Sequence, residues 1–221
     1  MDAKQDSLEA LQDIRRMMER SSRFISLSGW SGVAAGFSAL LGAWLAHQRI
    51  LQYKTDKLGL ARELSDYFGG SGPIVLIRDL CWIAAGTFLL AFLSAFLFTY
   101  IRSRKQGLSI WDRSAQRLVW NTLMPMGVGG IFILRALQLN YYDLVAPGCL
   151  LFYGLALVNA SRYAVGEIRY LGYTQLLLGI LCLWNAGHGI FFWSMGFGVM
   201  HIVYGGLMWW KYERGAQSEK A

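Results

Sequence analysis

Six long apolar stretches, separated by polar connections, dominate the pattern of this chain. They cover residues 24–46, 74–101, 118–134, 144–160, 170–184 and 190–210. A helix of about 20 apolar residues spans the ~30 Å hydrocarbon core of a bilayer. The pattern therefore predicts an all-α polytopic membrane protein with six transmembrane helices in one domain, residues 24–210.

The polar segments around these spans predict two further helices. Residues 1–23 contain an amphipathic pattern over 6–23, and Asp6 and Glu9 have the spacing of a capping box. We expect this helix on the cytoplasmic side, either on the membrane surface or against a protein partner. A shorter amphipathic pattern between the first two spans, residues 58–68, predicts a helix on the outer face. Residues 211–221 are expected to form a cytoplasmic tail.

The distribution of charge predicts the orientation. Fifteen of the 21 Lys and Arg residues lie in the N-terminal segment, the 102–117 and 161–169 connections and the C-terminal segment. Basic residues that flank spans stay in the cytoplasm. We therefore expect the protein in the cell inner membrane, with both termini on the cytoplasmic side. The net charge of +7 then reflects topology and contact with the lipid bilayer, and no nucleic-acid partner is expected.

Polar side chains at membrane depth are costly and are the first candidates for function. In the inner half, Pro125 lacks an N–H and should free the carbonyl of Asn121. His201 shares a helix face with Gly198 and Gly205, so we expect backbone to pack closely around the histidine. These groups either line a ligand-binding cavity or hydrogen-bond to one another between helices. The candidates are Asn121, Asn159, Gln175, His201 and Tyr204.

A second polar set falls at the outer ends of the spans. It either converges on a solvated pocket or consists of separate residues at headgroup level, where charge costs little. Within it, Asp79 or Asp143 is expected to pair with Arg78 or Arg135. The set comprises His47, Arg78, Asp79, Arg135, Asp143 and His188.

Catalytic and metal-binding patterns are weak in this sequence. Cys81, Cys149 and Cys182 lie in apolar stretches without C-x-x-C spacing, so we expect small buried side chains and no metal site. No nucleophile elbow, zinc-protease motif or P-loop is present. We therefore predict no catalytic residue and no cofactor.

Two stretches of the sequence resemble a known group of proteins and indicate a bacterial origin. The stretch from Gly196 to Gly205 (GFGVMHIVYG), with EIRYLGY from Glu167 to Tyr173 before it, resembles a family of small bacterial six-span inner-membrane proteins. The resemblance implies a bacterial multi-pass protein and assigns no catalytic or binding residue.

Three functions remain open from the sequence. The first is a small-solute carrier or sensor that uses the inner polar candidates. The second is a membrane scaffold or regulatory partner that docks through residues 6–23. The third is a membrane enzyme that uses the outer aspartates and His188. A homo-oligomer is compatible with each.

Overall fold

The computed structural model describes residues 29–58, 72–106, 111 and 113–212, which are mostly helical, with short turns between the helices and no strand among the described residues. The first three helices are α2 (Gly29–Leu58), α4 (Gly72–Gln106) and α5 (Arg113–Gln138). A short η1 (Tyr142–Leu144) leads into α6 (Val145–Ala160), which is followed by α7 (Ile168–Trp184). A last continuous helix consists of α8 (Gly189–Trp193), the π-helical η2 (Ser194–Met200) and α9 (His201–Tyr212).

The helical architecture agrees with the sequence prediction. Among the described residues, five helical segments are long and apolar enough to cross a membrane, and α7 is a shorter apolar helix of 17 residues, about 25 Å long. A short turn separates the last two apolar segments, since Asn185 ends α7 and Gly189 begins α8.

The predicted boundaries differ most at the first span. Residues 48–58 were assigned to a connection, but α2 continues through them to Leu58. No glycine or proline lies between Ala43 and Leu58, so nothing ends the helix where its apolar residues end. The predicted helix at 6–23, most of the one at 58–68 and the tail from 213 onward lie outside the described residues.

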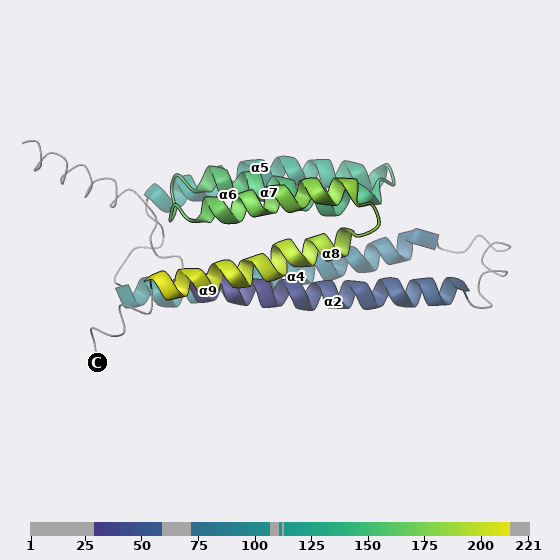
Figure 1. Ribbon diagram of the computed structural model, residues 1–221, viewed down its shortest axis with the longest axis horizontal. Helices are drawn as coiled ribbons and strands as arrows, with labels where there is room; N and C mark the ends of the chain where they lie inside the picture. The colour runs from purple at the N-terminus through teal and green to yellow at the C-terminus, as the bar shows by residue number, and fades with distance from the viewer. Residues whose placement is uncertain (1–28, 59–71, 107–110, 112, 213–221) are drawn as a thin grey trace, which may run out of the picture.

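The helices form two layers of three (Figure 1). One layer contains α5, α6 and α7, which follow one another along the chain. The other contains α2, α4 and the α8–η2–α9 helix, so the last helix packs against the first described one. Segments α8 and η2 also pack on α6 and α7, whereas α9 packs mainly on α2. The layers are therefore joined mainly through α8 and η2.

Glycines allow close contacts within each layer. A Cβ atom added to Gly32 of α2 would lie 3.1 Å from the Cα of Gly205 in α9. A Cβ added to Gly154 of α6 would lie 2.9 Å from the carbonyl oxygen of Gly172 in α7. Small residues let helix backbones approach closely, which favours helix association in lipid. The four-residue spacing of Gly32 and Gly36 in the sequence favours such an approach, and a Cβ added to Gly36 would lie 2.7 Å from the Gly198 carbonyl oxygen.

Large apolar side chains cover much of the outer surface. On α4 the rings of Phe88, Phe92, Phe96 and Tyr100 stack in sequence at centroid distances of 6.2–6.4 Å, and each is exposed. A water-exposed surface of this kind would be unfavourable, whereas hydrocarbon solvates it well. The surface fits the membrane-protein class indicated by the helix lengths.

Candidate functional site

A buried polar cluster joins the two layers near the middle of the bundle. His201, the first residue of α9, is 7% exposed, and its Nε2 lies 2.8 Å from the hydroxyl oxygen of Tyr153 in α6. Its Nδ1 lies 3.0 Å from the carbonyl oxygen of Gly196. A carbonyl only accepts, so Nδ1 carries the proton, and in the neutral imidazole Nε2 accepts from the Tyr153 hydroxyl. The ring is thus fixed in one tautomer.

Gln175 of α7 adds a second link to the same carbonyl. The side chain is fully buried, and its Nε2 donates a 2.7 Å hydrogen bond to the oxygen of Gly196. Its Oε1 is also buried and has no hydrogen-bond partner within the described part of the chain. A Cβ atom at position 196 would lie 2.5 Å from this oxygen, so a larger residue there would displace the Gln175 or Leu150 side chain.

The Gly196 carbonyl, which both side chains contact, belongs to a π-helical segment of the last helix. Residues Ser194–Met200 form seven residues of π-helix between two α-helical segments, with Gly196 and Gly198 buried. π-helical turns are rare, and they occur often at functional sites. The donors on Gly196 come from Gln175 in one layer and from His201 in the other, so this wide turn is the point where both layers contact one carbonyl.

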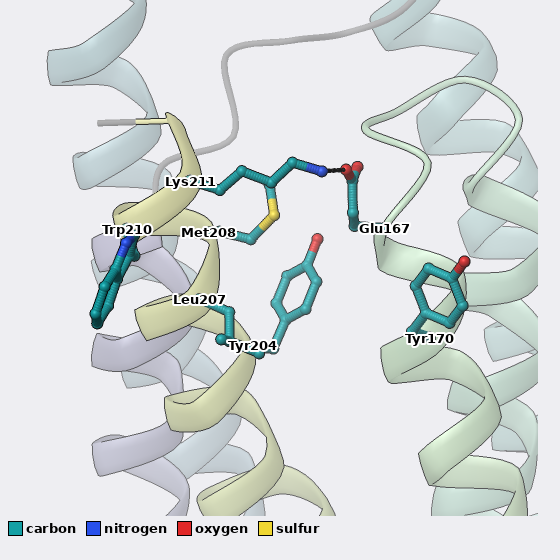
Figure 2. A pocket seen from close by; sticks show the side chains of 7 residues that line it. All are labelled: Glu167, Tyr170, Tyr204, Leu207, Met208, Trp210 and Lys211. Carbon is teal, nitrogen blue, oxygen red and sulfur yellow. Dashed lines mark hydrogen bonds and ion pairs between the residues drawn. The ribbon is translucent and has the colours of Figure 1, made fainter. Parts of the chain in front are cut away.

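A cleft opens between the layers toward the end where α9 finishes and α7 begins. It has a volume of about 610 Å³ and lies one helical turn beyond His201. Figure 2 shows the Tyr204 ring extending from α9 toward α7, with Tyr170 on the opposite wall. The lining is almost wholly apolar at its sides, and its residues are Glu167, Tyr170, Tyr204, Leu207, Met208, Trp210 and Lys211.

An ion pair spans the mouth of this cleft. The Lys211 Nζ lies 2.5 Å from the Glu167 Oε1, and both side chains are partly solvent-exposed. Lys211 belongs to α9, and Glu167 is the N-cap residue of α7. The pair therefore connects the two layers at this end of the bundle (Figure 2).

The inner candidates from the sequence separate into three places. Gln175 and His201 meet at Gly196, and Tyr204 lines the cleft. Asn121 and Asn159 form a pair between α5 and α6, where the Asn159 Nδ2 donates to the Asn121 carbonyl at 2.9 Å and to its Oδ1 at 3.2 Å. The carbonyl expected to be freed by Pro125 thus has a protein partner. Whether these residues bind a ligand stays a prediction.

The glycines beside the histidine face a different helix from its ring. Gly198 contacts Leu40 of α2, and Gly205 contacts Val33 of α2. The His201 ring instead lies against the rings of Tyr153 and Phe197, with centroids 5.5 and 6.0 Å away. The imidazole is therefore flanked by these two aromatic rings and by the Gly196 carbonyl.

The outer candidates lie on both layers. Asp79 of α4 pairs with Arg49 of α2 at 2.6 Å and with its neighbour Arg78 at 3.3 Å. The predicted pairing of an aspartate with Arg78 is present, and Arg49, which the sequence analysis did not select, is the closer partner. On the other layer Arg135 donates to Gln138 at 3.1 Å, and Asp143 lies in η1. His47 is exposed on α2, and His188 is exposed at the start of α8.

The three cysteines are free thiols, exposed at Cys81, intermediate at Cys149 and buried at Cys182. Among residues 29–58, 72–106, 111 and 113–212, no group of three or more His, Cys, Asp or Glu side chains is placed to hold a metal ion.

Sequence reasoning missed Tyr153, Gly196 and the Glu167–Lys211 pair. A tyrosine in the middle of an apolar span was a usable signal, because its hydroxyl needs a partner there. The Gly196 carbonyl had no such signal, since every residue carries one. The ion pair joins residues 44 positions apart, and only the packing of α9 beside α7 reveals it.

Comparison with known proteins gives no assignment, because no protein-family model, no curated protein and no solved structure matches this chain.

Proposed function

We propose that this chain is a small-solute carrier or sensor of a bacterial cytoplasmic membrane, with both termini inside and the interlayer cleft opening to the cytoplasm. The observation that supports it is the cleft of about 610 Å³ between two layers that pack together mainly at α8 and η2. Binding sites are usually apolar concavities with few polar groups, and they form where structural units meet. The cleft has this composition.

The polar cluster adds a means of coupling. A solute in the cleft would lie beside Tyr204, one helical turn from His201, whose ring bonds Tyr153 of the opposite layer. A ligand that moves α9 relative to α7 therefore changes the hydrogen bonds between the layers. Such a change is what a carrier needs for alternating access and what a sensor needs for signalling.

The binding step is tested by filling the cleft. Leu207 lines it and is 63% exposed, so Leu207→Trp should be tolerated by the fold and should occupy the space. Val203, on the same helix and 50% exposed, does not line the cleft, and Val203→Trp is the matched control. Purified protein is screened for thermal stabilisation by single-chain amphiphiles. Loss of stabilisation in Leu207→Trp alone supports the proposal, and equal responses in all three proteins would refute it.

The orientation and the mode of action need separate measurements. Reporter fusions at Ala221 and at Gly187 should show the first position inside and the second outside. In proteoliposomes, counterflow of a bound solute identifies a carrier, whereas binding without flux identifies a sensor. An extracytoplasmic Ala221 would overturn the proposed cytoplasmic opening.

A further inference from the structure

The polar and apolar side chains of the cleft lie in separate parts of it. Its walls are made by side chains such as Tyr204, Leu207 and Met208, and its charged residues, Glu167 and Lys211, lie together at the mouth (Figure 2). From Tyr204 to Lys211 is seven residues of helix, about 10 Å. A ligand that matches this surface has an apolar chain and one polar head at the mouth.

The charges around the mouth favour an anionic head. The Arg169 guanidinium carbon lies 5.4 Å from the centre of the Tyr170 ring, so a second cation flanks the wall opposite Lys211. Charges of one sign around a concave site raise the local concentration of ligands of the opposite sign. Further basic residues lie at the same end of the bundle, on α4, α5 and the α6–α7 connection: Arg102, Arg104, Lys105, Arg117 and Arg162.

Glu167 already places a carboxylate where such a head would bind. Its Oε1 accepts from the Lys211 ammonium, which has three N–H donors. Glu167 is also the N-cap residue of α7. A carboxylate released from Lys211 would remain beside the positive end of the α7 helix dipole, which lowers the cost of displacing it.

We propose that the cleft binds a single-chain carboxylate, whose head replaces Glu167 on Lys211 and whose chain lies against Tyr204, Leu207 and Met208. This inference rests on the proposed function and names the ligand class. Replacement of Glu167 removes a polar link between α9 and α7 at the open end of the bundle, so binding and separation of the layers are coupled.

The test compares three compounds that have the same ten-carbon chain and differ in their polar head group. Radiolabelled decanoate is bound to the full protein in nanodiscs of phosphatidylcholine, with decanol and decyltrimethylammonium as competitors. Decanoate should bind tightest. Lys211→Gln should weaken the binding of decanoate by about fivefold, the size of effect expected for a partly exposed ion pair. The protein should then no longer prefer decanoate to decanol. Glu167→Gln should strengthen the binding of decanoate, because the Glu167 carboxylate no longer competes for Lys211. Lys54→Gln, which replaces an exposed lysine near the opposite end of the bundle and outside the cleft lining, should leave binding unchanged.

The outcomes separate the two proposals. If decanol competes as well as decanoate and Lys211→Gln has no effect, while Leu207→Trp weakens all three compounds, the carboxylate inference is wrong and the cleft remains a binding site. If none of the compounds binds, or Leu207→Trp changes nothing, both proposals fail. A photoreactive decanoate supplies a second readout, with labelling expected at Leu207 or Trp210 and labelling confined to α4 counting against the cleft.

Discussion

Gly29 and Gly205 hold the backbones of α2 and α9 in direct contact. A Cβ atom added to Gly29 would lie 2.5 Å from the Gly205 carbonyl oxygen, and one added to Gly205 would lie 2.6 Å from the Gly29 carbonyl oxygen. The contact is between backbone atoms, so no side-chain rotation relieves it. The helices themselves must move apart to admit a methyl group.

Gly205→Ala should therefore destabilise the protein by about 1–3 kcal/mol, the usual cost of overpacking. The adjacent glycine is the control, because a Cβ at Gly206 would meet nothing within 4 Å. Gly206→Ala should be neutral or stabilising by up to about 1 kcal/mol, since alanine favours helix. Unfolding of both variants in SDS–detergent mixtures measures the difference, and equal stabilities would contradict the close α2–α9 contact.

Tyr153→Phe should lower stability by about 0.6–1.7 kcal/mol, the range for hydrogen bonds inside membrane proteins. The change removes the Tyr153 hydroxyl, which donates a hydrogen bond to the Nε2 of His201. This buried nitrogen then loses that partner. Tyr173, which is 52% exposed, gives the matched Tyr173→Phe control. A double-mutant cycle with His201→Phe checks the pair, and a coupling energy of zero would mean that the contact carries no stability.

Asn159→Leu should destabilise the wild-type chain more than it destabilises a Pro125→Ala background. In the wild type, Pro125 has no N–H for the Asn121 carbonyl, and the Asn159 side chain supplies the hydrogen bond. Alanine at 125 restores an intrahelical donor four residues on. Unfolding free energies of the four proteins give the test; identical costs of Asn159→Leu in both backgrounds would refute this exchange of partners.

Asp79→Asn should lower stability only slightly, because its pair with Arg49 is partly exposed. The cost should shrink at high salt, which screens exposed charges. Thermal unfolding at low and high salt measures both effects, with Asp143→Asn as the comparison, since no ion pair of Asp143 is found among the described residues. A salt-independent loss would point instead to a change in helix packing.

The sequence predicted the helices well because apolar length is a local property. It also located the close face at Gly32 and Gly36, since spacing by four residues places small side chains on one side of a helix. It did not reveal that the last helix returns to pack on the first described one. Nor did it separate Asn121 and Asn159 from Gln175 and His201, because depth in the membrane says nothing about which helices are neighbours.

The pairing of α2 with α9 has a consequence for biosynthesis. The ribosome makes α9 after all the other described helices, so the glycine face of α2 lacks its native neighbour until α9 has been made. The α5–α6–α7 layer, which is contiguous along the chain, has all its members earlier. The layer of α2, α4 and α9 is therefore complete only once α9 has been made, and a product truncated before Gly189 would keep the α2–α4 contact but leave the glycine face of α2 uncovered.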